Sequence, residues 1–149
     1  MFELIATLFI TASSALLFAY WFRYTCVLIL KAKTTRDFAG EVAAANRLSF
    51  PAVQSELWAA SANLGYLHDA LNRDYALLTY LVSHAAGHQG EASLEDRMLQ
   101  FNYRLMGAWY RISRPFSTAA ARKALEEMSL VVAHFANVMG ERAMADAAA

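Results

Sequence analysis

The chain is poor in residues that interrupt or cross-link a fold. It has two prolines, six glycines and one cysteine in 149 residues. The single Cys26 has no partner for an internal disulfide, which excludes a small disulfide-stabilised scaffold. Because Cys26 lies in an apolar run, we interpret it as a small hydrophobic residue, with palmitoylation as the alternative. The scarcity of glycine and proline favours long helices.

The sequence also lacks an excess of charge of either sign. Thirteen basic and thirteen acidic side chains cancel, and residues 37–149 hold nine basic against twelve acidic ones. A domain that binds nucleic acid through its overall field is basic instead, so nucleic-acid binding is not expected. No P-loop, dinucleotide fingerprint or nucleophile elbow occurs. We therefore expect neither an enzyme nor a cofactor.

Apolar residues are abundant. They make up 58% of the chain, against about 45–50% in ordinary soluble domains. Residues 4–22 form a run of nineteen residues without charge, long enough to cross a hydrocarbon core about 30 Å thick as a helix. A cleaved signal peptide needs a basic start and a small-residue cleavage site, but this run follows Glu3 and stays bulky. Residues 1–36 are predicted to be a signal-anchor, a transmembrane helix with a basic flank.

The flanking charges predict the orientation of this anchor. Lys31, Lys33 and Arg36 follow the run, and only Glu3 precedes it. The positive-inside rule then places the N-terminus outside and the C-terminal part in the cytoplasm, and we expect a bacterial inner membrane. Aromatic residues near the end of the run predict an interfacial belt, formed by Tyr20, Trp21, Phe22 and Tyr24.

Arg23 stands among these aromatic residues. If the membrane surface lies at the aromatic belt, Arg23 is at the level of the lipid headgroups. If the helix stays in the membrane until Lys31, Arg23 lies about 12 Å deep and needs a partner there. Both interpretations are open from the sequence.

Small residues recur at every fourth position of the anchor. Such a ridge lets a second transmembrane helix approach closely. We interpret it as a docking ridge that ends in the arginine and consists of Thr7, Thr11, Ala15, Ala19 and Arg23. The alternative is that alanine, serine and threonine are simply common in membrane helices.

Residues 37–149 predict a small antiparallel bundle of about four helices, so the fold class is all-α with a single N-terminal transmembrane helix. No segment alternates with the period of a strand, and helical periodicity dominates. Turn residues delimit the helices. The predicted helices cover about residues 37–48, a segment starting at Ser49, and residues 63–86, 93–112 and 118–144, with 145–149 fraying.

The helix after Ser93 is apolar on two sides. Ser93 and Asp96 have the spacing of a capping box. We predict that its core face consists of Leu94, Met98, Phe101, Leu105, Trp109 and Ile112. A second apolar edge consists of Leu99, Tyr103, Met106 and Tyr110. A bundle core needs only one apolar side of this helix. The second side favours contact with another protein or with a membrane, and a tightly packed core is the alternative.

The same helix carries a regular row of arginines. Arg97, Arg104 and Arg111 lie seven residues apart, with Arg114 assigned to the same side. The row is either a solvated face or a partner-binding stripe for an acidic partner or for anionic lipid headgroups, because arginine forms bidentate contacts. Arginine is also enriched at protein interfaces together with tyrosine and tryptophan. Because acidic side chains outnumber basic ones in residues 37–149, we favour a protein partner over a nucleic acid.

Histidines supply only weak metal candidates. His84 and His88 lie one helical turn apart with Glu91 beyond them, a spacing that can share a metal ion. Histidines near the end of a helix also interact with its dipole without any metal. His68 is predicted to lie at the surface. His134 is predicted to lie in the core, and a haem ligand there is the alternative.

These features together predict a non-catalytic single-pass subunit, adaptor or assembly factor of a larger membrane protein complex. It would dock through its transmembrane helix and an arginine- and aromatic-rich face of the bundle. The expected partners are the lipid bilayer and a membrane protein or a second copy of the chain. Two alternatives remain, a membrane-anchored metal- or haem-binding redox protein and a self-associating signalling or scaffold module.

Overall fold

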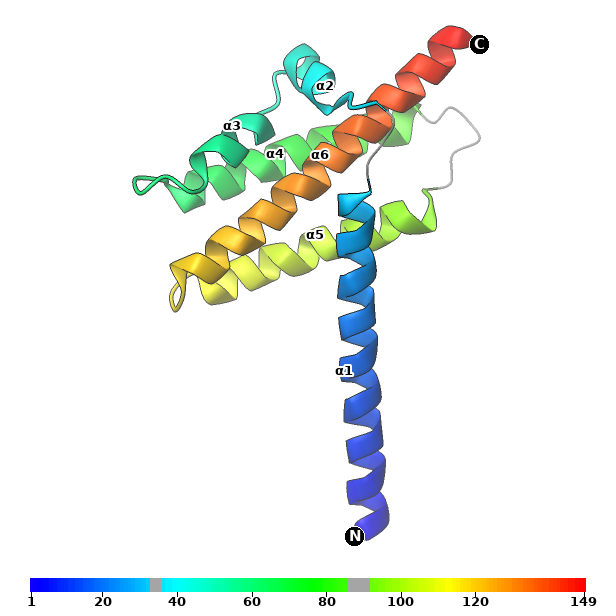
Figure 1. The fold of residues 1–149 in the computed structure, drawn as a ribbon, viewed down its shortest axis with the longest axis vertical. Coiled ribbons are helices and arrows are strands. Elements are labelled where there is room, and N and C mark those ends of the chain that lie inside the picture. The colour runs from blue at the N-terminus through cyan, green and yellow to red at the C-terminus, as the bar shows by residue number, and fades with distance from the viewer. Residues whose placement is uncertain (33–35, 86–91) are drawn as a thin grey trace. The chain divides into compact units, whose positions relative to one another are not determined.

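The fold is known from a computed structural model that describes residues 1–32, 36–85 and 92–149. Throughout these ranges the regular structure is helical, without strands. The chain divides into two compact units, Met1–Ala32 and Lys33–Ala149. The first contains helix α1 and the second contains helices α2 to α6 (Figure 1). The predicted fold class, a long apolar N-terminal helix followed by a helical bundle, is confirmed.

Helix α1 runs without interruption from Phe2 to Lys31. Its apolar window has a mean hydropathy of 1.8, and none of that window is buried. Thirty residues at about 1.5 Å each give roughly 45 Å, which exceeds the thickness of a hydrocarbon core. The helix is therefore long and apolar enough to cross a membrane, and it continues past Arg23. It ends because Ala32 adopts an extended conformation, with φ −60° and ψ 121°.

Two short helices open the second unit. Helix α2 spans Ala39–Asn46 and ends at Arg47, whose φ of 53° is left-handed. This conformation lets the Leu48 N–H donate to the Ala43 carbonyl at 2.9 Å, which satisfies one of the last helical carbonyls. Helix α3 spans Phe50–Glu56 and carries a proline in its first turn, a position that proline tolerates because the N–H there has no helical acceptor.

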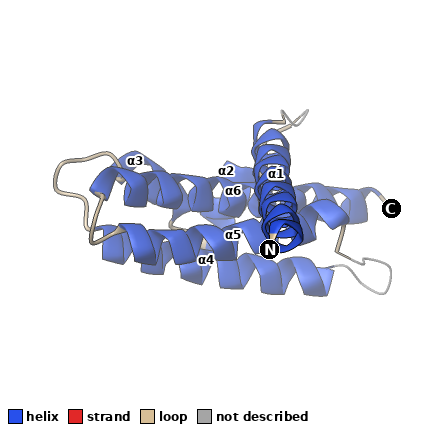
Figure 2. Cartoon of the chain, turned by 90° about the horizontal axis from the view of Figure 1, so that it is seen from below, coloured by secondary structure: helices blue, strands red, loops and turns tan. Residues whose placement is uncertain are grey.

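Three long helices make up the body of the bundle. They are α4 (Leu64–Ala85), α5 (Leu94–Ser113) and α6 (Thr118–Ala148). Helix α5 runs opposite to α4 and α6 (Figures 1 and 2). Helix α6 is central, because it contacts α2, α3, α4 and α5. Its fully buried side chains include Leu125, Met128, Val131, Val132 and Phe135.

A glycine allows α2 to approach α6 closely. A Cβ atom at Gly140 would collide with the side chain of Phe38. The backbone N–H of Phe38 donates to the Asn137 side-chain oxygen at 2.7 Å beside this contact. The start of the bundle is thus held on α6 by a close approach and a buried hydrogen bond.

Two details differ from the sequence-based expectation. The bundle has five helices in the described residues, two of them short, rather than about four. The expected fraying at the C-terminus is wrong, because α6 continues to Ala148. Alanine has the highest helix propensity, so an alanine-rich end continues a helix without tertiary contacts.

Candidate functional site

Helix α5 turns its second apolar edge inward, and the predicted core face is wrong. The inward side chains are Leu99, Asn102, Tyr103, Met106 and Tyr110. Five of the six predicted core residues lie outward instead, with Leu94 75% and Ile112 59% exposed, and the sixth, Met98, is half-buried. We define the outer face of α5 as the large exposed apolar side chains Leu94, Phe101, Leu105, Trp109 and Ile112.

Polar pairing explains why this edge of α5 is buried. The Tyr103 hydroxyl donates to the Asn72 side-chain oxygen of α4 at 2.9 Å. Asn102 donates to Glu127 of α6 at 2.7 Å. On the buried edge, Asn102 and Tyr103 therefore have polar partners on α6 and α4, whereas the buried Tyr110 hydroxyl has no hydrogen-bond partner in the described residues. The number of apolar residues on each face of α5 does not distinguish the two faces. The hydrogen bonds that polar side chains on one face form with other helices do distinguish them.

The arginine row lies beside the outer face rather than within the core. Arg97, Arg104 and Arg111 are all exposed. Arg114 does not continue this row: its guanidinium lies over the Tyr110 ring, with the Arg114 Cζ atom 5.9 Å from the ring centroid. The structure thus joins three of the four predicted arginines into one row that borders an exposed apolar face.

Stacked rings join α4 and α5 behind this face. The rings of Tyr75 and Tyr103 stack with centroids 3.8 Å apart, and those of His68 and Tyr110 stack at 4.6 Å. Burial raises the pKa of the Tyr103 hydroxyl above its usual range, so this hydroxyl stays protonated and acts as a hydrogen-bond donor. The predicted surface position of His68 is wrong, because its ring is buried between the two helices. The sequence signal for this cluster is the repeated aromatic and histidine residues at helical spacing.

His68, which is buried, and His134, which is half-buried, are expected to make the stability of the bundle depend on pH. Burial lowers the pKa of both His68 and His134 below 6.5, because it disfavours the charged ring, while neighbouring carboxylates oppose this effect. The unfolded chain therefore takes up protons at a higher pH than the folded chain. We expect the free energy of unfolding to be constant above about pH 7 and to fall as the pH decreases from 7 to 5. The slope for each histidine is at most about 1.4 kcal/mol per pH unit.

Urea unfolding of the full-length protein in mild detergent at several pH values measures this dependence. The double variant His68→Gln and His134→Gln should flatten the slope between pH 7 and 5, whatever its absolute stability. His84→Gln is the matched control, since His84 is exposed, and it should keep the slope. A slope unchanged in the double variant would show that other groups control the acid sensitivity.

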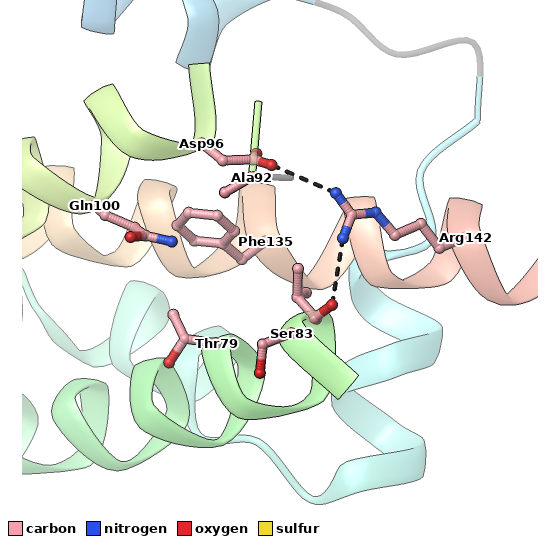
Figure 3. A pocket seen from close by; sticks show the side chains of 8 residues that line it. Thr79, Ser83, Ala92, Asp96, Gln100, Phe135 and Arg142 are labelled. Atoms are coloured by element: carbon pink, nitrogen blue, oxygen red, sulfur yellow. Dashed lines mark hydrogen bonds and ion pairs between the residues drawn. The ribbon is translucent and has the colours of Figure 1, made fainter. Parts of the chain in front are cut away.

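One cavity of about 130 Å³ lies between α4, α5 and α6 (Figure 3). Arg142 reaches across it, donating to the Val82 carbonyl at 3.3 Å and approaching the Asp96 carboxylate at 3.4 Å. Asp96 also completes the capping box with Ser93. These contacts tie the last turn of α4 and the first turn of α5 to α6, so the polar groups here have structural partners.

The predicted features of α1 fall on one continuous helix. The hydroxyls of Thr7 and Thr11 donate to carbonyls four residues earlier, at 2.7 and 2.8 Å. This pairing satisfies the two hydroxyls inside the helix. Ala15, Ala19 and Arg23 continue the same spacing. In the aromatic belt, the Tyr20 and Tyr24 rings stack with centroids 6.4 Å apart, and Phe22 stacks with Phe18 at 6.5 Å. Trp21 is 59% exposed.

The weak metal candidates are not brought together in the described residues. His84 is exposed, and its Nδ1 atom lies 2.8 Å from the Tyr80 carbonyl. His88 and Glu91 lie outside the described residues. Within residues 1–32, 36–85 and 92–149, no three histidine, cysteine or acidic side chains group as metal ligands. His134 is half-buried and lies edge-on to Phe135, at 5.9 Å between centroids.

Comparison with known proteins adds no relative. No protein-family model matches the sequence, and searches of curated proteins and of solved structures find no significant match. The features of the chain that bear on its function are α1 and the outer face of α5.

Proposed function

We propose that this protein is a non-catalytic single-pass subunit, adaptor or assembly factor of a larger membrane protein complex. Its anchor is α1, and its bundle offers the outer face of α5 to a partner. The observation that carries the proposal is this face, where Leu94 and Ile112 are more than half exposed beside a row of arginines. Exposed apolar patches rimmed by polar residues mark interaction sites in soluble domains.

The anchor supports the same role. Small residues at every fourth position, from Thr7 to Ala19, suit close packing against another transmembrane helix. Basic residues after the apolar run, including Lys31 and Arg36, favour an N-terminus outside and a cytoplasmic bundle. We propose a bacterial inner membrane as the setting, in which the bundle contacts the cytoplasmic part of the partner.

Substitutions in α1 test the ridge. Ala15→Leu adds bulk on the ridge, and we expect it to reduce co-purification of a partner at least about tenfold while membrane insertion persists. Ser13→Leu is the matched control, because it adds the same side chain at nearly the same depth on the opposite side of the helix. Native mass spectrometry of the full-length protein from mild detergent measures the bound partner.

The two variants separate the outcomes. A partner lost in Ala15→Leu and kept in Ser13→Leu supports docking through the ridge. Equal retention in both would exclude the ridge as an interface. A bare polypeptide from the unaltered chain, without any bound protein, would contradict the proposed role as a complex subunit.

A further inference from the structure

The outer face of α5 has the spacing of a coiled-coil seam. Apolar residues follow one another at intervals of four and three along the helix, at Leu94, Met98, Phe101, Leu105, Ala108 and Ile112. These intervals are those of the a and d positions of a heptad repeat, in which Met98, Leu105 and Ile112 occupy a. In the same register, Arg97, Arg104 and Arg111 occupy all three g positions. We call this set of a, d and g positions the α5 seam.

The α5 seam is accessible along the helix except at Met98, which is half-buried. Leu94 is 75% exposed at one end, Leu105 39% in the middle and Ile112 59% at the other end. Phe116, just beyond the helix, is 87% exposed. Twenty residues at about 1.5 Å each give a seam roughly 30 Å long, enough to match three heptads of a second helix.

We propose that the α5 seam binds one helix of a partner protein, with apolar residues at its own a and d positions and acidic residues beside them. This inference rests on the proposed function, since it names the kind of segment that the partner presents to the bundle. Residues at e and g determine which partner a coiled coil accepts. Three arginines on one edge therefore select a helix with glutamate or aspartate on the facing edge, with which arginine forms bidentate pairs.

Charge argues against a second copy of the chain at this seam. In an antiparallel pair, g positions face g positions, and the arginines of the two copies would repel each other. In a parallel pair, g faces e, so Arg97 would face Asn102 and Arg104 would face Trp109. Neither arrangement supplies an acidic residue to any of the three arginines.

Charge also argues against a bilayer surface. The other edge of the seam begins with Glu95, which is exposed, and continues with Asn102, which is buried and donates to the Glu127 carboxylate of α6. An anionic lipid surface would attract one edge and repel the other. A partner helix presents different residues to the two edges and can match both.

A pair of synthetic peptides tests the proposal. Both have about four heptads with isoleucine at a and leucine at d; the acidic peptide has glutamate at e and g, and the basic peptide has lysine there. Fluorescence anisotropy measures their binding to the full-length protein in mild detergent. At low ionic strength we expect the acidic peptide to bind at least about tenfold more tightly than the basic one. The difference should decrease at high salt.

Charge reversal provides the matched control. The triple variant Arg97→Glu, Arg104→Glu and Arg111→Glu changes only exposed side chains, so it should unfold at the same urea concentration. It should reverse the preference and bind the basic peptide more tightly. Ile112→Asp leaves the arginines in place but interrupts the apolar seam, and it should weaken binding of the acidic peptide at least about tenfold.

Several outcomes would overturn the proposal. One is equal binding of the two peptides, or binding of neither. Another is a dimer in sedimentation equilibrium that Ile112→Asp dissociates, which would assign the seam to a second copy. A third is quenching of Trp109 by brominated lipid in nanodiscs, with Trp21→Phe and Trp58→Phe removing the other tryptophans, which would assign it to the bilayer. Failure of the peptide test while Ala15→Leu still releases a partner would refute the seam alone.

Discussion

Leu99→Ala is expected to lower the free energy of unfolding of the bundle by about 3–5 kcal/mol. Leu99 is fully buried on the inward edge of α5, and truncation there removes buried apolar surface and leaves a cavity. Leu94→Ala, the same substitution in the same helix, should change the free energy by less than about 0.5 kcal/mol, because Leu94 is 75% exposed. Urea unfolding of the full-length protein in mild detergent, followed by near-ultraviolet circular dichroism, measures both.

This comparison tests the orientation of α5, on which the α5 seam depends. A larger loss for Leu94→Ala than for Leu99→Ala would restore the core face that the sequence favours. It would also remove the seam from the surface. Equal losses of unfolding free energy in the two variants would mean that both sides of α5 are buried in the detergent-solubilised protein.

Asp74→Ala is expected to lower the free energy of unfolding by about 2–4 kcal/mol. The Asp74 carboxylate of α4 accepts from the backbone N–H groups of Ser49 and Phe50, at 2.6 and 2.7 Å. The Ser49 side chain forms no capping hydrogen bond. The Asp74 carboxylate therefore takes its place and caps α3 from a different helix, α4. Burial raises the pKa of Asp74, and the two N–H donors oppose that rise. Alanine would leave both donors without an acceptor.

Two further variants and a local measurement make this test specific. Asp74→Asn keeps a neutral acceptor and should lose less stability than Asp74→Ala. Asp69→Ala, whose carboxylate is 79% exposed, should cost no more than about 1 kcal/mol. Hydrogen exchange should accelerate at the amides of Ser49 and Phe50 in Asp74→Ala. Unchanged exchange at those amides would show that α3 is capped in another way.

The long helices were predictable because their signals are local. The uncharged run of residues 4–22 predicts a membrane-length helix, and α1 spans it. Ser93 and Asp96 form the capping box that their spacing predicts, and the Ser117 side chain accepts from the Ala120 N–H at 3.2 Å. Each of these features involves residues within a few positions of one another, so no knowledge of the packing was needed.

The capping of α3 and the burial of His68 were not predictable in this way. Asp74 lies 25 residues after Ser49, and nothing between them indicates that the two meet. The burial of His68 likewise depends on a residue far away in the sequence, because its ring stacks on Tyr110 of α5. Contacts between helices pair distant residues, and a single sequence contains no direct record of them.

The sequence by itself determined that the protein is helical, where its long helices begin, and that α5 carries more apolar surface than one core requires. Only the tertiary structure decided which side of α5 is buried. Both sides are apolar enough for a core, so the hydrophobic effect does not separate them. Hydrogen bonds and ring stacking from Asn102, Tyr103 and Tyr110 to α4 and α6 turn that edge inward. The row of arginines then lies beside an exposed apolar face, because the inward edge is packed against α4 and α6 and charged side chains stay in solvent.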